Sequence, residues 1–247
     1  MPIGRNFFAT TLAGLLFLGF QTNVVAQPLS DEALDQRIRD YILDHPEVVV
    51  EAIQRWQQQQ RQAEAEQFKS VLQARRDEIL DVSVGTVVGN PDGNVTVVEF
   101  MDYNCGYCRR VFPAIQQLAE DDGDLRILFK EFPILGPGSE IASRAALAAR
   151  EQGLYSEFHN ALMSADQRLE EPQVMAIARE VGLDTDQLRR DMQSPEIDAI
   201  IQRNQALARD LGINGTPGFI IGDEIVRGAT SLDHLKQLVA EARRDAS

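Results

Sequence analysis

The two cysteines of this 247-residue chain have two residues between them, as Cys105-Gly106-Tyr107-Cys108. An apolar run typical of a strand, residues 95–101, precedes them, and a helical pattern, residues 109–120, follows them. A thiol at the first turn of a helix lies near unpaired backbone N–H groups and the positive end of the helix dipole, and both favour the thiolate. We therefore predict a redox-active dithiol in which Cys105 is the exposed, acidic sulfur and Cys108 is the inward sulfur that resolves a mixed disulfide.

Three other roles for this pair are weaker. A zinc site would need two further ligands, and the chain offers only His45, His159 and His234, which fall in separate predicted helices. A structural disulfide that closes so short a loop removes little chain entropy. Chance is the third, and the lack of any other cysteine speaks against it. We therefore expect no metal site and no cofactor.

The first 26 residues have the pattern of a signal peptide. They carry one charge, Arg5, then an apolar stretch over residues 7–20, then small residues ahead of Gln27. That stretch is shorter than the roughly 20 residues that cross a bilayer. We therefore expect cleavage and a soluble periplasmic protein, in a compartment where disulfides persist.

The composition is that of an acidic globular protein. The formal net charge is −14, and loss of Arg5 with the signal peptide makes it one unit more negative. Such a charge disfavours binding to nucleic acid and to anionic lipid surfaces. With 44% hydrophobic and 25% charged residues, the chain can form one core with an appendage.

Residues 27–80 are predicted to form a helical oligomerisation and stem region. Apolar residues recur there at helical spacing, with a break at residues 44–47, which indicates two helices. Between residues 57 and 67 the pattern becomes polar all round, as in a helix that runs through solvent. An apolar helix pair on such a stem has no obvious partner in its own chain, so we predict a homo-oligomer. The alternative is that the pair folds back onto the main domain.

Residues 81–247 have the element order of an α/β domain. Strands are predicted at 83–88, 95–101 and 125–132, with a helix between the last two, which should then be parallel. A helical block, residues 138–211, is inserted before two short strands at 218–221 and 224–227. An amphipathic helix over 231–243 ends the domain.

A strand that leads into Cys-x-x-Cys, a helical insertion and then Gly215-Thr216-Pro217-Gly218 together resemble the DsbA-type thioredoxin fold. The resemblance covers residues 83–242. It implies an α/β thioredoxin fold with an inserted helical domain, a cis-proline at Pro217 against the dithiol, and a buried carboxylate at Glu99, six residues before Cys105. On local sequence alone, Gly-Thr-Pro-Gly could also be an ordinary turn.

Finer details are similar to the bacterial disulfide isomerases and to the ScsC-like branch, which is associated with copper tolerance. The isomerase likeness rests on Gly106-Tyr107 between the cysteines and on Thr216 before the proline. The ScsC likeness rests on the N-terminal helical region and on residues 104–110. Together they imply an isomerase or a copper-stress thiol protein that assembles through its N-terminal segment.

Side chains beside the dithiol are expected to contact substrate. Because Pro217 has no N–H, the backbone of Thr216 is left free to pair with an extended substrate strand. The Thr216 hydroxyl would face the sulfurs and tune their potential. Gly106 and Tyr107 would form part of the recognition surface.

Glu99 is the expected proton carrier. A carboxylate within a strand should either have a raised pKa or meet Lys130 from the neighbouring strand, which would then tune the site. From there it could relay the proton that Cys108 must lose. A surface salt bridge is the alternative. Arg109 and Arg110 could add positive field or could be solvated helix residues.

We therefore predict an exported thiol-disulfide oxidoreductase that acts on protein thiols and disulfides, as an isomerase or reductase, with a membrane redox partner. The same residues would serve a dithiol oxidase that is recharged by a membrane partner, because the direction depends on redox poise. A different class is a copper-binding thiol protein or holdase chaperone, in which the two thiolates capture Cu(I).

Overall fold

The computed structural model describes residues 30–245 of the chain, apart from the side chains of residues 64, 65, 67 and 68. The predicted signal peptide, residues 1–26, lies outside the described residues. The chain divides into two units, one that ends at Gln59 and one that begins at Gln60.

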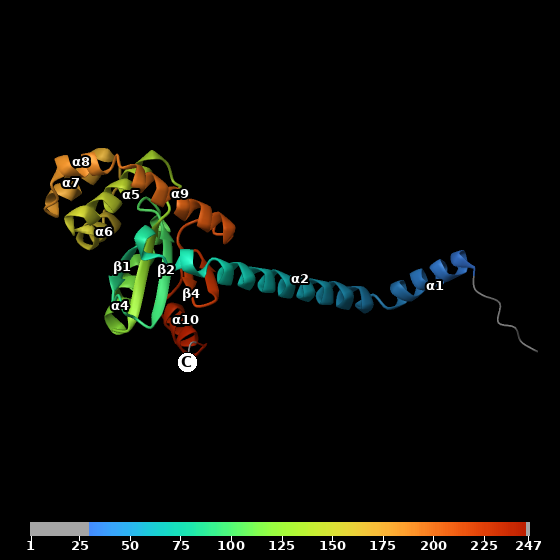
Figure 1. The fold of residues 1–247 in the computed structure, drawn as a ribbon. Helices are drawn as coiled ribbons and strands as arrows, with labels where there is room; N and C mark the ends of the chain where they lie inside the picture. The colour runs from blue at the N-terminus through green and yellow to red at the C-terminus, as the bar shows by residue number, and fades with distance from the viewer. Residues whose placement is uncertain (1–29, 246–247) are drawn as a thin grey trace, which may run out of the picture. The chain divides into compact units, whose positions relative to one another are not determined.

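The first unit is helical. It contains α1 (Asp31–Asp44) and the first part of α2 (Glu47–Ala74), so the two helices and the break between them are confirmed (Figure 1). The Ser30 hydroxyl caps α1 by accepting a hydrogen bond from the Ala33 N–H at 3.3 Å. Large apolar side chains of this unit are exposed on both helices: Leu34, Ile38, Tyr41, Ile42, Leu43, Val48, Val49, Val50, Ile53 and Trp56.

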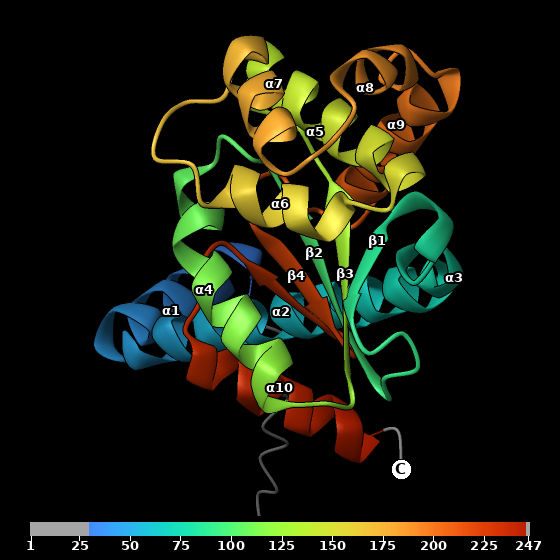
Figure 2. The same ribbon diagram turned by 90° about the vertical axis from the view of Figure 1, so that its left-hand side faces the viewer.

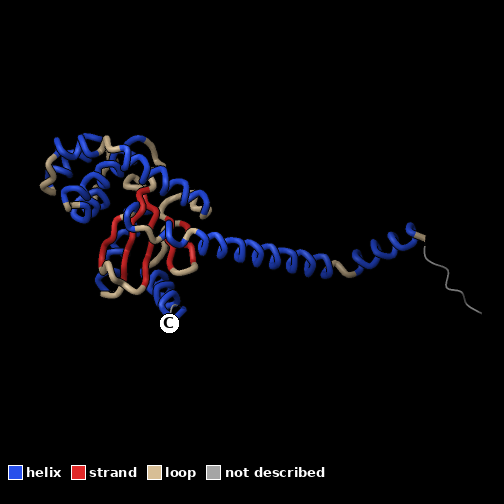
Figure 3. The backbone as a smooth tube through the Cα atoms, in the orientation of Figure 1, coloured by secondary structure: helices blue, strands red, loops and turns tan. Residues whose placement is uncertain are grey.

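The second unit is built on a five-stranded sheet (Figure 3). Its strands are β1 (Thr86–Gly89), β2 (Val95–Met101), β3 (Leu125–Glu131), β4 (Gly218–Ile221) and β5 (Glu224–Arg227). They lie in the order β1-β3-β2-β4-β5, with β2 and β3 parallel and the other neighbours antiparallel. The predicted parallel pair is confirmed, and the alternation of side chains along it gives the sheet two apolar faces.

One face of the sheet is covered by α4 (Gly106–Asp121) and α10 (Leu232–Asp245), and Figure 2 shows α4 crossing it. The sheet residues buried on this face include Val97, Ile127, Phe129 and Ile221. The opposite face buries Val98, Phe100, Leu128 and Ile220. They pack there against residues of α2, of α3 (Arg76–Ile79) and of α9 (Pro195–Asp210) or just beyond it: Leu72, Ile79, Leu207 and Leu211.

The second unit begins before Asp81, the residue at which the sequence predicts the start of the α/β domain. Leu72 and Ile79 are buried among the apolar residues of the sheet, so the end of α2 and all of α3 belong to the second unit. Instead of a strand from residue 83, a 3-10 turn (Val82–Val84) comes first and β1 follows it. The Asp81 carboxylate starts this turn by accepting the Ser83 N–H at 2.8 Å.

The inserted helices lie beyond one end of the sheet (Figures 1 and 2). They are α5 (Pro137–Ala149), a 3-10 turn (Arg150–Gln152), α6 (Tyr155–Met163), α7 (Glu171–Glu180), α8 (Thr185–Asp191) and α9. The predicted helical insertion between β3 and β4 is therefore confirmed. Across residues 30–245, no helix is both long and apolar enough to span a membrane.

Candidate active site

The dithiol lies where β2 gives way to α4. Cys105 is the residue that caps α4, and its Sγ accepts a hydrogen bond from the Cys108 backbone N–H at 3.4 Å. Because the first N–H groups of a helix have no partner within the helix, they are free to point at a group in this position. The chain therefore places Cys105 at the positive end of α4 and Cys108 within its first turn.

The loop before β4 lies against the first cysteine. The Thr216–Pro217 peptide bond is cis, as the family resemblance implies. The Cys105 Sγ lies 3.2 Å from the Thr216 carbonyl oxygen. Antiparallel pairing of β4 with β2 aligns Gly218 with Phe100, near the end of β2 that leads to the dithiol. The sheet thus joins segments that are more than a hundred residues apart in the chain.

Both cysteines are free thiols and both are buried. Cys108 is fully buried, and Cys105 is only 5% exposed, so the prediction of an exposed Cys105 needs correction. The residues between them form the open surface instead. Tyr107 is 59% exposed, with the Arg110 guanidinium 5.0 Å from its ring centre, and a side chain added at Gly106 would meet nothing within 4 Å.

The two thiols have opposite acidities. A hydrogen bond with the Cys108 side chain lowers the pKa of Cys105 to about 5, with further help from Thr216 and from the backbone of Tyr107 and Cys108. Burial raises the pKa of Cys108 far above its usual range. Cys105 is therefore the thiolate at neutral pH, and Cys108 keeps its proton until something removes it.

Glu99 lies fully buried on the same sheet face as α4. Neither of its carboxyl oxygens has a hydrogen-bond partner within residues 30–245. Burial, and to a smaller extent the negative charge on Cys105, raises the pKa of Glu99 to about 8. Of the two predicted outcomes for this residue, a raised pKa is the one that its burial without a partner favours.

Lys130 does not meet Glu99. In the parallel register Lys130 stands opposite Phe100 on the other face of the sheet, and its Nζ donates to the carbonyl oxygens of Glu78 at 3.1 Å and Asp81 at 3.3 Å. Burial lowers the pKa of Lys130 to about 8. The predicted contact between Lys130 and Glu99 is therefore wrong, because the sheet separates the two side chains, and Lys130 cannot tune the dithiol through that contact.

Two polar residues beside the cysteines fix the rim of the site. Asn104 makes a pair of hydrogen bonds with the backbone of Leu169, from Nδ2 at 3.0 Å and to Oδ1 at 2.7 Å. Arg109 donates to the carbonyl oxygens of Tyr103 at 2.7 Å and Gln167 at 2.9 Å. Its guanidinium is therefore a structural tie to the loop between α6 and α7, a role that the sequence does not reveal.

A buried polar cluster lies behind the turn that carries the dithiol. The Glu131 Oε1 accepts hydrogen bonds from the hydroxyls of Tyr103 at 2.9 Å and Tyr155 at 3.0 Å, and the Tyr103 hydroxyl also lies 2.9 Å from His159 Nδ1. Burial raises the pKa of Glu131 to about 8 and lowers that of His159 to about 3. The only sign of this buried cluster in the sequence is an acidic residue, Glu131, at the end of an apolar strand.

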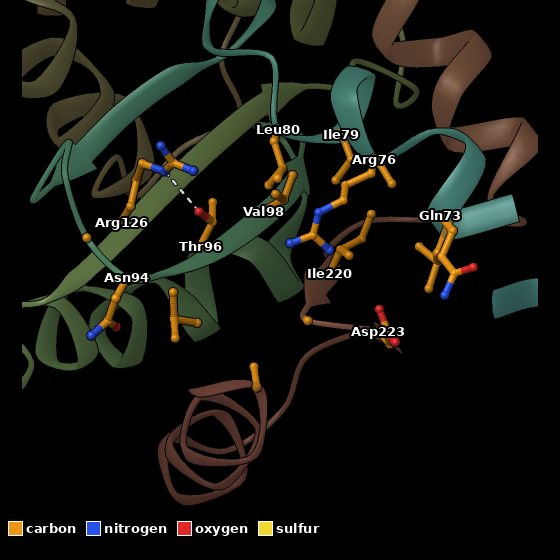
Figure 4. A pocket seen from close by; sticks show the side chains of 15 residues that line it. Gln73, Arg76, Ile79, Leu80, Asn94, Thr96, Val98, Arg126, Ile220 and Asp223 are labelled. Carbon is orange, nitrogen blue, oxygen red and sulfur yellow. Dashed lines mark hydrogen bonds between the residues drawn. The ribbon is translucent and has the colours of Figure 1, made fainter. Parts of the chain in front are cut away.

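A cavity of about 160 Å³ lies on the opposite face of the sheet, and neither cysteine lines it. Figure 4 shows the side chains around it, among them Arg76, Arg126, Thr96, Val98 and Ile220. The Arg126 Nε donates to the Thr96 hydroxyl at 2.9 Å. Within the part of the chain that is described, no group of three or more His, Cys, Asp or Glu side chains could hold a metal ion.

Comparison with known proteins agrees with this geometry. Residues 96–240 match the DSBA-like thioredoxin domain, and residues 32–63 match the copper resistance protein ScsC N-terminal domain. The chain belongs to the DsbA-like thioredoxin family. Its Cys-x-x-Cys pair is Cys105 and Cys108, and its N-terminal helices are of the ScsC type.

Solved structures resemble this chain over more than two thirds of its length. A thioredoxin-like oxidoreductase from Silicibacter pomeroyi DSS-3 is 50% identical, with a TM-score of 0.67 over 68% of this chain and 98% of that one. The catalytic domain of Proteus mirabilis ScsC is 28% identical, with a TM-score of 0.66 over 71% of this chain and 98% of that one.

Curated relatives include longer proteins. A Na⁺/H⁺ antiporter NhaA 3 from Salinispora tropica is 28% identical over 158 residues, which make up 63% of this chain. The chain spans about a quarter of the length of such relatives, since the match covers 24% of that antiporter.

Proposed function

We propose that this protein is an exported thiol-disulfide oxidoreductase that acts on protein substrates, as a disulfide isomerase or reductase. The observation that carries the proposal is the position of two free thiols at the start of α4, where Cys105 caps the helix and its Sγ accepts the Cys108 N–H. This position gives the two thiols opposite acidities. The pKa of Cys105, at the N-terminus of α4, falls to about 5, whereas burial raises that of Cys108. Cys105 is thus a nucleophilic thiolate at neutral pH, whereas Cys108 is a protonated thiol that does not yet react.

The first step is attack by the Cys105 thiolate on a sulfur of a substrate disulfide. The substrate S–S bond breaks, a bond forms between Cys105 and the substrate, and the second substrate sulfur leaves as a thiolate. An extended substrate can pair with the backbone beside Cys105, where Thr216 and Pro217 form the surface. Tyr107 adds an exposed ring to the same surface.

Resolution of this mixed disulfide requires that Cys108 lose its proton, because the attacking group is its thiolate. While Cys105 is a thiolate, its charge helps to raise the pKa of Glu99. Once Cys105 is bonded to substrate, that charge is gone and Glu99 ionises more readily, so it can accept the proton. The Cys108 thiolate then attacks the Cys105 Sγ, the enzyme disulfide forms and the substrate leaves with two electrons.

Isomerisation takes a different second step. The substrate thiolate that was set free attacks another disulfide of the substrate and releases a different substrate thiolate. That thiolate attacks the mixed disulfide, so a new substrate disulfide forms and Cys105 leaves as a thiolate without oxidation of the enzyme. Its low pKa makes Cys105 a good leaving group. The same chemistry run backwards would oxidise substrates, so a membrane redox partner sets the direction by keeping the pair reduced or oxidised.

The N-terminal unit would assemble the protein into a homo-oligomer. Its large apolar side chains, Leu43 and Trp56 among them, are exposed on α1 and α2. Residues 32–63 match the ScsC N-terminal domain. Exposed apolar faces of this extent are commonly buried by self-association. Export to the periplasm is supported by the charge and hydropathy pattern of residues 1–26.

Recovery of activity from scrambled ribonuclease tests the proposed function. The wild-type protein should restore ribonuclease activity in the presence of a low concentration of thiol, and Cys105→Ser should not. Cys108→Ser is the matched control, because isomerisation needs only Cys105 whereas reduction needs both sulfurs. If the wild-type protein shows neither isomerase nor reductase activity, the proposal is overturned, and a copper-binding or holdase role for the two thiolates is favoured.

Equilibration with a glutathione buffer separates isomerase from oxidase. For a pair that works in the reduced state, we expect a reduction potential well below that of the strong oxidases, which is about −120 mV. A potential at that value would instead indicate a dithiol oxidase.

A further inference from the structure

Tyr103 is a fully buried residue of the turn between β2 and α4, two residues before Cys105. Its hydroxyl lies 2.9 Å from Oε1 of Glu131, at the end of β3, and 2.9 Å from Nδ1 of His159, which lies on α6. Glu131 and His159 are buried as well. One hydroxyl group thus joins the turn that carries the dithiol both to the sheet and to the inserted helices.

The surroundings of His159 fix the direction of these hydrogen bonds. Burial lowers the pKa of His159 to about 3, so its imidazole is neutral and carries one N–H. Its Nε2 is buried and has no partner within residues 30–245, and a buried N–H without an acceptor is costly, so we assign the proton to Nδ1. The Tyr103 hydroxyl then accepts the His159 N–H and donates its own proton to Glu131. A phenylalanine in this position could do neither.

The backbone around Tyr103 is tied to the start of α4. The Tyr103 carbonyl oxygen accepts the Arg109 Nε–H at 2.7 Å, and the Asp102 carbonyl oxygen accepts the Cys105 N–H at 3.0 Å. The place of Cys105 over the first turn of α4 therefore depends on where Tyr103 lies. The contact that depends on it is the hydrogen bond of 3.4 Å from the Cys108 N–H to the Cys105 Sγ. Because hydrogen bonds weaken steeply when they are misaligned, a small displacement of the turn would weaken this one.

We propose that Tyr103 is a positioning residue, whose hydroxyl holds the turn before α4 so that the Cys105 Sγ meets the Cys108 N–H. This inference rests on the proposed function, because it gives Tyr103 a part in the reactivity of the Cys105 thiolate. Tyr103 is fully buried, so it acts through Cys105 and does not contact the substrate. The inserted helices contribute as well, since His159 on α6 is one of the two groups that hold the hydroxyl.

The first experiment removes one hydroxyl at a time. Tyr103→Phe keeps the ring and loses both hydrogen bonds, so the pH midpoint for alkylation of Cys105 by iodoacetamide should rise by about 0.5–1 unit. The equilibrium with glutathione should shift about three- to tenfold toward the disulfide. Tyr155→Phe is the matched control, because the Tyr155 hydroxyl donates to the same Glu131 oxygen at 3.0 Å but comes from α6 and not from the turn. Both variants should unfold at lower denaturant concentration, but only Tyr103→Phe should change the alkylation midpoint.

The second experiment tests the acceptor. Glu131→Gln retains a carbonyl oxygen that can accept from Tyr103, so it should keep the wild-type alkylation midpoint. Glu131→Met removes the acceptor and should raise the midpoint as Tyr103→Phe does. If Glu131→Met does not fold, the comparison of Tyr103→Phe with Tyr155→Phe decides.

The inference and the proposed function fail in different ways. A wild-type alkylation midpoint in Tyr103→Phe overturns the inference, even where the wild-type protein isomerises scrambled ribonuclease normally. An equal rise of the midpoint in Tyr103→Phe and Tyr155→Phe also overturns it, because the change then follows the loss of stability and not the position of the turn. A wild-type protein that neither isomerises nor reduces its substrates would instead overturn the proposed function.

Discussion

The Sγ atom of Cys105 lies 3.2 Å from the carbonyl oxygen of Thr216, 111 residues further along the chain. This contact joins the N-terminus of α4 to the loop before β4. The carbonyl oxygen can accept a hydrogen bond from the Cys105 thiol only. The thiolate is stabilised by the side chains of Cys108 and Thr216 and by backbone N–H groups at the start of α4, and an extended substrate would reach Cys105 and Thr216 at once.

The pKa of Cys105 should respond to Thr216. In the wild-type protein, alkylation by iodoacetamide should proceed at a constant rate at neutral pH and slow as the pH falls through about 5. In Thr216→Val this midpoint should move upward, because the hydrogen bond between the Thr216 side chain and Cys105, which lowers the pKa of Cys105, is removed. The reduced state then loses stability, so the equilibrium with glutathione should shift about two- to tenfold toward the disulfide.

A Thr230→Val variant serves as the control for this experiment, because the Thr230 hydroxyl lies beside His234 in an exposed position. It should alkylate with the wild-type pH profile. If Thr216→Val shows that same profile, Thr216 has no part in the acidity of Cys105.

Glu99 should make the folded protein less stable as the pH rises from about 5 to 8. Its pKa rises from 4.5 to about 8 on folding, so in this range the folded protein holds a proton that the unfolded chain has released. The free energy of unfolding then decreases with increasing pH. Glu131 has a pKa raised to about 8 and contributes with the same sign. Glu99→Gln should therefore reduce this decrease, as measured by chemical denaturation at several pH values.

Glu120→Gln, at an exposed position of α4, is the matched control and should keep the wild-type pH dependence. Parallel stability curves for the wild-type protein and Glu99→Gln would show that Glu99 is not a buried carboxyl with a raised pKa.

Redox behaviour should be independent of Lys130. Its ammonium group is bonded to carbonyl oxygens on the sheet face opposite Glu99. Lys130→Met should therefore change the equilibrium with glutathione less than twofold, whereas Glu99→Gln should slow resolution of the mixed disulfide by about tenfold or more. The slow step is measured by acid quenching of the mixed disulfide. An altered equilibrium in Lys130→Met would show coupling across the sheet.

The strand, the dithiol and the helix that follows could be predicted from the sequence because their apolar patterns are local. β2, β4 and β5 begin and end at the predicted residues. The position of Lys130 relative to Glu99 could not be predicted, because it depends on the register between β2 and β3. The contacts of the buried Asp102 carboxylate, which accepts the backbone N–H groups of Ile134 and Leu135, could not be predicted for a similar reason. Two of its backbone partners lie 32 and 33 residues away, and nothing in the local sequence identifies them.

The N-terminal helical residues can be deleted as far as Gln59 without removing residues of the second unit, which contains the sheet and its core. Deletion of Gln27 to Gln59 ends at the boundary between the two units and removes exposed apolar side chains such as Ile38 and Trp56. The shortened protein should be a monomer by light scattering, should react with glutathione disulfide at the wild-type rate and should isomerise scrambled ribonuclease poorly. An unchanged mass per assembly would contradict the role of these helices in self-association.

A longer deletion, Gln27 to Leu80, provides the comparison. It also removes Leu72 and Ile79, which are buried against the sheet face that contains Phe100. Loss of a large buried apolar side chain costs about 2–5 kcal/mol, so this protein should unfold at much lower denaturant concentration or fail to fold. Equal stability of the two deletion variants would mean that the catalytic domain does begin near Asp81, as the sequence suggests, and that the helical residues before it contribute nothing to its core.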